Sequence, residues 1–317
     1  MPNFTRIFRI REAGILVALI ALAAITAILN PRFLSAFNLQ ILTRQIAIFG
    51  IIAIGETFVI VTMGIDLSPG SMVSMTCVLV AWFMTHSFGI VGSVLAILVV
   101  SAGVGLWHGF YVSKLRIPPF IITLCTFLIA RGLGGAITRG WPILNLPSSF
   151  PYLWYGMVLK VLPVPVLILA MIAGISVFIL RYSPLGRHIY AVGGSIEAAR
   201  LSGINVDRTR IIVYVISATL AGVVGMLHAA RLEQGTANVG QFYELYAIAA
   251  SVIGGTSLFG GIGTVLGTVI GASILSTIWN SMVLLKVSAY WQNVVLGVVI
   301  VTAVTVDTLR KRDGSSA

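Results

Sequence analysis

The side chains that could do chemistry are few in this chain of 317 residues, and no set of them has the spacing of a catalytic or metal site. The sequence holds nine acidic residues, four histidines and two cysteines. No nucleophile lies beside a base and an orienting group, and the Cys and His residues are too dispersed to form a ligand set. We therefore expect neither an enzyme, nor a bound metal, nor another cofactor, and we interpret the histidines as structural or interfacial.

Two glycine-rich breaks carry polar residues that could contact a solute. The first is GIDLSPG at 64–70, where Ser68-Pro69 has the pattern of a helix N-cap followed by a first-turn proline. The second is GGTSLFGGIG at 254–263. The breaks are either turns between capped helices or non-helical segments that line a polar cavity inside a membrane. On the second hypothesis, the candidate pathway and gate residues are Gly64, Asp66, Ser68, Pro69, Gly255, Thr256, Ser257, Asn280 and Gln292.

The longest polar stretch, 181–210, contains a short helix with clear end signals. Ser195 can cap its N-terminus, Glu197 lies in the first turn where a negative charge favours the helix dipole, and Gly203 can end it. A helix of about two turns, roughly 10 Å long, is unstable in water by itself and must be docked. Its support is either its own chain or another protein. The apolar residues available for such contacts are Ile196, Ala199, Leu201 and Ile204.

These polar stretches are embedded in an apolar chain. The mean hydropathy is +1.04, and only 9% of the residues are charged, against about 25% in soluble proteins. We therefore expect an all-α polytopic membrane protein whose residues 1–317 form a single transmembrane domain. A crossing helix needs about 20 residues, and on that basis there are about ten. The predicted spans lie at about 13–29, 41–63, 69–86, 89–113, 118–138, 161–181, 211–231, 243–259, 264–285 and 289–309.

The distribution of Lys and Arg predicts the orientation. One set of loops holds thirteen basic residues: Arg6, Arg9, Arg11, Lys114, Arg116, Arg181, Arg187, Arg200, Arg208, Arg210, Arg310, Lys311 and Arg312. The other set holds six: Arg32, Arg44, Arg139, Lys160, Arg231 and Lys286. The positive-inside rule then places both termini and the loop 181–210 in the cytoplasm. The aromatic-rich loop 139–160 lies outside, and we expect both glycine-rich breaks to approach the loop 181–210.

Three ionisable residues, Glu56, Arg131 and Glu244, fall within predicted spans. A charge at the bilayer centre costs on the order of 2.5–3.5 kcal/mol, so each needs a partner or a wet cavity. The scarcity of such groups argues against a proton-driven carrier.

Glycine also forms a stripe on one predicted helix. Gly263, Gly267 and Gly271 recur every four residues and so share a face. Such a stripe predicts close packing against a neighbouring helix.

Four segments, in order, resemble one family of membrane proteins. They are GIDLSPGSM from residue 64, EAARLSGINV from 197, YELYAIAASVIGGTSLFGGIGTVLGT from 243 and VSAYWQNVVLGVVIV from 287. The chain is similar, over about residues 30–308, to the permease subunits of ribose-type monosaccharide ABC importers, which are near relatives of the branched-chain amino-acid permeases. Tyr246 is a departure, because family members often carry an acid there.

The resemblance implies a type II-like importer permease fold in the bacterial inner membrane. It implies a cytoplasmic ABC ATPase, a periplasmic or lipid-anchored sugar-binding protein and a second permease subunit, which would make a homodimer. The loop 181–210 resembles the EAA loop, which docks into the ATPase. The residues that this likeness assigns to ATPase coupling are Ser195, Glu197, Ala198, Ala199 and Gly203.

The residues themselves agree that ATP must be bound elsewhere, because the chain has no phosphate-binding loop and no Gly-Lys pair. We expect a permease that imports a neutral sugar such as ribose, xylose or galactose, since the polar candidates are hydroxyls and amides. The alternatives are a self-sufficient secondary carrier or facilitator, or an ABC permease for a branched-chain amino acid, a polyol or a nucleoside. The scattered basic residues exclude a nucleic-acid partner and leave membrane lipid as the surrounding partner.

Overall fold

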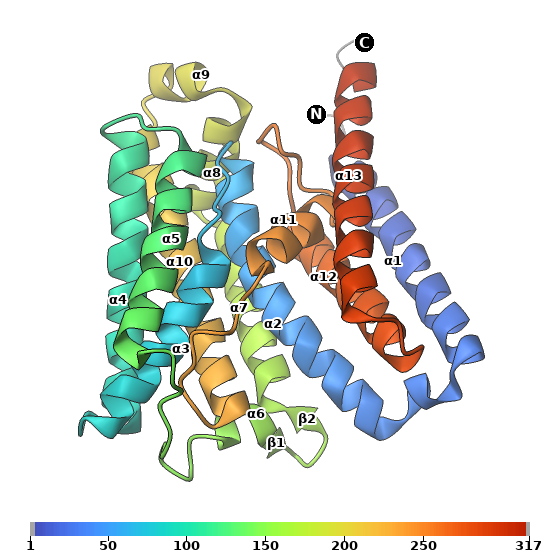
Figure 1. The fold of residues 1–317 in the computed structure, drawn as a ribbon. Coiled ribbons are helices and arrows are strands. Elements are labelled where there is room, and N and C mark those ends of the chain that lie inside the picture. The colour runs from blue at the N-terminus through green and yellow to red at the C-terminus, as the bar shows by residue number, and fades with distance from the viewer. Residues whose placement is uncertain (1–3, 315–317) are drawn as a thin grey trace.

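The protein is mostly helical, as the sequence predicts (Figure 1). The computed structural model describes the backbone of residues 4–314 and the side chains of residues 13–309, so the six basic side chains nearest the termini lie outside the described part. The elements are α1 (Phe4–Leu29), a 3-10 helix η1 (Pro31–Leu34), α2 (Ala36–Val61), α3 (Pro69–Thr85), α4 (Gly89–Ser113), α5 (Pro119–Thr138), α6 (Tyr152–Tyr155), β1 (Met157–Val158), β2 (Leu162–Pro163), α7 (Val164–Tyr182), α8 (Pro184–Gly194), α9 (Ile196–Leu201), α10 (Val206–Leu232), α11 (Tyr243–Ile253), α12 (Val265–Leu284) and α13 (Ala289–Gly314).

Helices α2 and α10 form the centre of the bundle. α2 is apolar on all sides and its second half is buried, which is the pattern of a helix enclosed by protein. α4 approaches α10 closely because Gly105 and Gly109 lie directly against the backbone of Val215 and Ile211. The outer helices expose large apolar side chains, as a surface in contact with lipid tails does.

Seven helices of the described residues, α2, α4, α5, α7, α10, α12 and α13, are long and apolar enough to cross a membrane. The other three predicted spans coincide with shorter apolar helices, Ala13–Leu29, Pro69–Thr85 and Tyr243–Ile253. α11 has 11 residues and is about 16 Å long, roughly half the thickness of a hydrocarbon core. The multi-pass helical architecture is confirmed. The span predicted at 243–259 is too long, because the helix ends before Gly254, and the count of ten stays a prediction.

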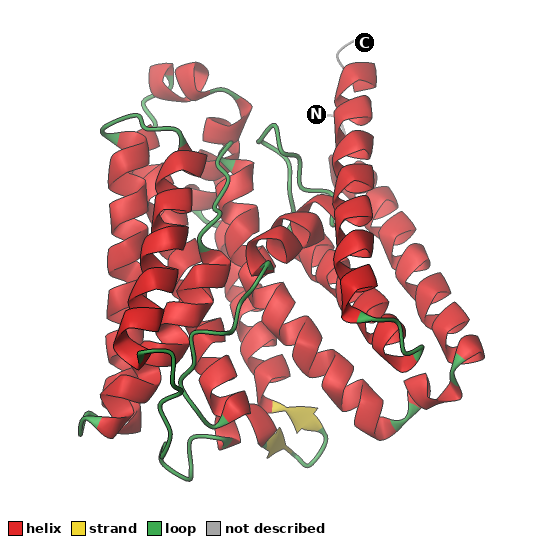
Figure 2. Cartoon of the chain, in the orientation of Figure 1, coloured by secondary structure: helices red, strands yellow, loops and turns green. Residues whose placement is uncertain are grey.

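A non-helical segment, 233–242, runs into the bundle ahead of α11 (Figure 2). The sequence predicted only a short external loop there. Ser74 in α3 donates a hydrogen bond to the Ala237 carbonyl oxygen (2.7 Å), and Gly240 lies against Gly70 at the start of α3. Irregular backbone inside a membrane needs protein partners for its polar groups, and α3 supplies them.

The two ends of the bundle differ. α8, α9, the start of α1 and the end of α13 lie at one end, while the antiparallel β1–β2 hairpin and α6 lie at the other (Figures 1 and 2). The polar loop contains two helices where the sequence predicted one. α8 begins after Ser183, whose hydroxyl oxygen accepts from the Gly186 amide (3.1 Å), with Pro184 in the first turn. Gly193 and Gly194, a pair typical of a helix break, are the last residues of α8.

Candidate functional site

The short helix α9 has both of the end structures that the sequence predicts. The Ser195 hydroxyl oxygen accepts a hydrogen bond from the Ala198 amide (3.2 Å). At the other end, Gly203 has a φ of 78°. The Gly203 amide donates to the Arg200 carbonyl oxygen (2.9 Å), and the next amide donates to the Ala199 carbonyl oxygen (3.0 Å). This pair of bonds is a Schellman motif, which needs the left-handed conformation that glycine adopts readily.

α9 has one face against the protein and one face free. Ala199 is buried against Val192 of α8 and Val206 of α10. Glu197 and Ala198 are exposed, and Leu201 is 90% exposed. Of the four apolar residues expected to make contacts, three belong to this internal cluster. Leu201 alone is free for a partner.

α8 links α9 to the second glycine-rich break. The Tyr190 hydroxyl donates a hydrogen bond to the carbonyl oxygen of Gly263 (2.8 Å). Burial raises the pKa of Tyr190 to about 12, so the hydroxyl keeps its proton and stays a donor at physiological pH. Ile189 and Val192 are fully buried, which fixes α8 to the bundle.

The second break, α8 and the end of α2 meet at three backbone positions. The Gly261 amide, in the second break, donates to the carbonyl oxygen of Val61 (2.9 Å), the last residue of α2 before the first break. Gly193 of α8 lies between them, and a Cβ at this position would overlap the Val61 carbonyl oxygen. The second break therefore contacts the loop 181–210, whereas the first break is reached only through Val61, three residues before it, and only glycine permits this contact at residue 193.

Asp66 is the centre of a buried hydrogen-bond network in the first break. Its Oδ1 accepts hydrogen bonds from the Ser68 amide (2.9 Å) and hydroxyl (2.6 Å), and its Oδ2 accepts one from the Ser217 hydroxyl of α10 (2.9 Å). The Asp66 amide donates to Oε1 of Glu56 in α2 (3.1 Å). All four residues are buried. α3 begins at Pro69 as expected, but the Ser68 side chain binds Asp66 and does not cap the helix.

Gly64 lies where α2 gives way to this break. Its amide donates to the Val59 carbonyl oxygen (3.0 Å), and a side chain there would meet the Tyr214 hydroxyl. Tyr214 Oη and Glu56 Oε2 are buried and have no hydrogen-bond partner within the described residues. The surroundings of the first break therefore have two polar atoms whose hydrogen-bonding capacity is not used within the described residues.

The second break is held by an acid that sequence reasoning missed. Asp307 of α13 accepts hydrogen bonds on Oδ2 from the Ser257 hydroxyl (3.2 Å) and the Leu258 amide (3.0 Å). Gly255 has a φ of 92° and turns the chain out of α11. Thr256 is buried, and its hydroxyl has no partner among the residues described here.

Two candidate pathway residues lie apart from both breaks. The amide groups of Asn280 in α12 and Asn38 in α2 exchange two hydrogen bonds (3.0 and 2.8 Å) and are buried. This pairing joins two helices and leaves Asn280 little capacity for a solute. Gln292 lies near the start of α13, beside Tyr246 and Trp279. Its amide donates to the Val287 carbonyl oxygen (3.5 Å).

Two residues of the predicted glycine stripe, Gly267 and Gly271, pack a helix closely, whereas Gly263 lies before the start of α12. A Cβ at Gly267 would overlap the Gly254 carbonyl oxygen, and one at Gly271 would overlap that of Ala250. α12 therefore lies directly on α11, and together with the second break they form a tight helical hairpin.

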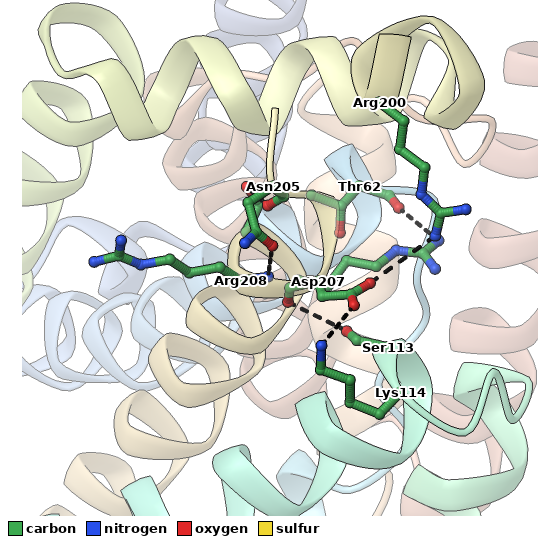
Figure 3. A network of polar contacts seen from close by, with 9 residues as sticks. Thr62, Ser113, Lys114, Arg200, Asn205, Asp207 and Arg208 are labelled. Carbon is green, nitrogen blue, oxygen red and sulfur yellow. Dashed lines mark hydrogen bonds and ion pairs between the residues drawn. The ribbon is translucent and has the colours of Figure 1, made fainter. Parts of the chain in front are cut away.

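A polar network ties α9 to α4 and α10 (Figure 3). The Asp207 carboxylate of α10 pairs with Lys114 (3.0 Å) and with Arg200 of α9 (3.9 Å). The Asn205 side chain caps α10 by accepting from the Arg208 amide (2.9 Å). Such exposed ion pairs contribute about 0–1 kcal/mol each, so they orient α9 more than they stabilise the fold.

Comparison with known proteins identifies the family. Residues 38–304 match the family described as branched-chain amino acid transport system / permease component. The chain belongs to this permease family. It is 39% identical to the ribose import permease protein of Escherichia coli, over 97% of each chain. It is also 39% identical to that of Bacillus subtilis, over 94% of this chain and 92% of the relative.

A third relative is named for a different sugar. The xylose transport system permease protein of Haemophilus influenzae is 32% identical, over 93% of this chain and 96% of the relative. No solved structure matches. The resemblance to ribose-type permeases is confirmed, and the permease is a multi-pass protein of the inner membrane.

Several site residues of the permease could not be found from sequence signals. Tyr190, Gly193 and Ser217 act through contacts with residues tens to more than a hundred positions away. Asp307 had a weak signal, since it is an acid at the end of an apolar run.

Proposed function

We propose that this permease carries a neutral sugar of the ribose or xylose class into the cell. The identity of 39% to ribose import permeases over nearly the whole chain supports this proposal. Hydroxyl groups beside the two breaks, on Ser68, Tyr214 and Thr256, match the hydrogen-bonding needs of a polyhydroxylated solute.

We propose that a separate ABC ATPase drives transport and docks on α9. One observation carries this proposal: α9 presents Glu197, Ala198 and Leu201 outward, while its buried side packs on α8, which contacts the second break and the end of α2 that leads into the first break. Force applied to α9 would reach Gly263 and Val61 through buried contacts. A flexible loop could not transmit such a movement.

The two breaks are proposed as the gate. Asp66, Ser68 and Thr256 are enclosed by the chain in this conformation, so the gate is closed. Opening it would separate Gly261 from Val61 and expose the unused Tyr214 hydroxyl. Gly64, Gly255 and Pro69 would set the backbone shape of the two segments.

The proposed assembly contains two copies of the permease, ten spans in each, with both termini and α9 in the cytoplasm. Thirteen basic residues against six support this orientation. The opposite end carries the exposed aromatics Trp141 and Tyr152. That end would receive the sugar-binding protein.

Purification of the full-length permease from its native membranes tests the proposal. We expect an ABC ATPase and a sugar-binding protein to accompany it, and the ligand of that binding protein to be a monosaccharide. Equilibration of ribose or xylose by the permease alone in liposomes, without ATP, would instead identify a secondary carrier or facilitator.

A further inference from the structure

An open pocket of about 270 Å³ lies between α4, α5, α9 and α10, at the end of the bundle that carries α9. Its volume is below the range of about 300–1,000 Å³ that is typical of sites for drug-sized ligands. The pocket therefore has room for a polar group such as a phosphate, but not for a whole drug-sized ligand. Its lining residues come from all four helices and the α4–α5 linker: Val112, Ser113, Arg116, Ile117, Pro118, Pro119, Ile196, Arg200, Asp207 and Arg210.

The pocket has more positive charge than the chain neutralises. Arg116, Arg200 and Arg210 line it, and Lys114 lies at its edge (Figure 3). Asp207 is the single carboxylate, and it is already shared by Lys114 (3.0 Å) and Arg200 (3.9 Å). Neither Arg116 nor Arg210 forms an ion pair within the described residues. Like charges gathered in this way repel one another unless an anion joins them.

The surroundings of the pocket are apolar on one side. Ile117 and Pro118 line it, and the neighbouring side chains of Leu115 and Phe120 are 54% and 52% exposed. A cationic pocket beside exposed apolar residues, at the end of a membrane-spanning bundle, matches a molecule that has both an anionic group and acyl chains.

We propose that this pocket binds the phosphate headgroup of an anionic phospholipid. The guanidinium groups of Arg116, Arg200 and Arg210 donate to the phosphate oxygens, a pairing whose planar geometry suits arginine. The acyl chains run along Leu115 and Phe120. The proposal needs the pocket to lie at a membrane surface and is independent of the sidedness and the substrate proposed above.

A lipid in this pocket would link α9 to the body of the permease. Arg200 belongs to α9, Arg116 to the α4–α5 linker and Arg210 to α10. A single phosphate bridging them would hold the docking helix against the bundle. The pocket would thereby make the position of α9 sensitive to the lipid composition of the membrane.

The test is native mass spectrometry of the full-length permease, purified in detergent and titrated with phosphatidylglycerol or with phosphatidylcholine. The variants are Arg116→Gln and Arg200→Gln. Arg208→Gln is the matched control, because Arg208 lies on α10 two residues before Arg210 and its side chain points away from Asp207 (Figure 3). Thermal unfolding in detergent checks that each variant is folded. Arg116 is exposed, so its variant keeps the fold.

We expect phosphatidylglycerol to bind more tightly than phosphatidylcholine. Arg116→Gln and Arg200→Gln should each weaken this binding about tenfold, whereas Arg208→Gln should leave it unchanged. Equal binding of both lipids, or an equal loss in Arg208→Gln, would overturn the proposal. So would stabilisation by inorganic phosphate equal to that by phosphatidylglycerol, which would identify a free anion as the ligand. Loss of ATPase attachment in Arg200→Gln with unchanged lipid binding would assign the arginine to a protein partner.

Discussion

Asp66 shows what a single charged residue needs in order to be buried in a membrane protein. A carboxylate is costly to bury unless its lone pairs are filled by hydrogen bonds. Ser68 and Ser217 supply three of these bonds, while Glu56 accepts from the Asp66 amide. The residue therefore joins α2, α3 and α10 at the first break, whatever its part in transport.

Substitution of Asp66 separates its structural role from its proposed role in the gate. Asp66→Asn keeps the shape and one acceptor oxygen, so the variant should fold with nearly normal thermal stability. Asp66→Leu leaves buried donors unpaired, each at a cost of about 1–3 kcal/mol, and should unfold at a lower temperature in detergent. Equal stability of Asp66→Leu and the unchanged protein would contradict the hydrogen-bond assignment.

Asp66→Asn also tests the gate, in proteoliposomes that contain the ATPase and the binding protein. If Asp66 takes part in the gate, Asp66→Asn should hydrolyse ATP without matching sugar uptake. Tight coupling and normal uptake in Asp66→Asn would leave Asp66 with its structural role alone.

At the scale of elements, Gly193 sets the contact of α8 with the second break and with the end of α2. Gly193→Ala should disturb this contact, because the added Cβ would overlap the Val61 carbonyl oxygen. Overpacking of this kind costs about 1–3 kcal/mol. Gly194→Ala is the matched control, since a Cβ there meets nothing within 4 Å. The temperature of thermal unfolding in detergent should be lowered by Gly193→Ala and left unchanged by Gly194→Ala. A similar effect of the two substitutions would mean that α8 tolerates displacement.

The free face of α9 gives a second prediction at this scale. Leu201→Ala should leave the thermal stability unchanged, because the side chain is 90% exposed, yet should weaken attachment of the ATPase.

Gly203→Val forces a β-branched residue into the left-handed region, at a cost of about 1–2 kcal/mol. This substitution should also weaken attachment of the ATPase, because it distorts the Schellman motif. Glu197→Lys should also weaken attachment by placing a positive charge at the helix N-terminus. Co-purification of the ATPase measures each effect, and full attachment in all three variants would remove α9 from the docking surface.

An element can be predicted from the sequence when the residues that define it are close together in the chain. The caps of α9 are local, so Ser195 and Gly203 could be recognised directly. α8 was missed because Gly193 and Gly194 indicate a break, whereas Gly193 is needed for close contact with a distant backbone. The segment 233–242 was missed because its partners lie on α3, more than 150 residues earlier. Asn280 was interpreted as a pathway residue because nothing local identifies Asn38, 242 residues away, as its partner.

At the scale of the whole molecule, the parts proposed for coupling lie at one end. α8, α9 and the contact of the second break with α2 occupy the end that also holds the start of α1 and the end of α13 (Figure 1). The arrangement places the docking helix and the proposed gate within a few contacts of each other.

Thiol labelling tests the orientation of this end. Ser195→Cys, in a background without Cys77 and Cys125, should resist membrane-impermeant reagents in intact cells and react after lysis. A cysteine at Trp141, at the opposite end and 79% exposed, serves as the control and should react in intact cells. Labelling of residue 195 in intact cells would reverse the orientation.

We propose that α8 transmits movement of α9 to the gate, and the amount of ATP hydrolysed per sugar imported measures this transmission most directly. Tyr190→Phe removes only the hydroxyl that donates to Gly263 (2.8 Å). Tyr182→Phe, on a ring that is 61% exposed, is the matched control. In proteoliposomes with the ATPase and the binding protein, the loss of one hydrogen bond should raise the ratio about two- to tenfold in Tyr190→Phe, with no change in Tyr182→Phe. A ratio in Tyr190→Phe equal to that of the unchanged permease would contradict transmission through α8.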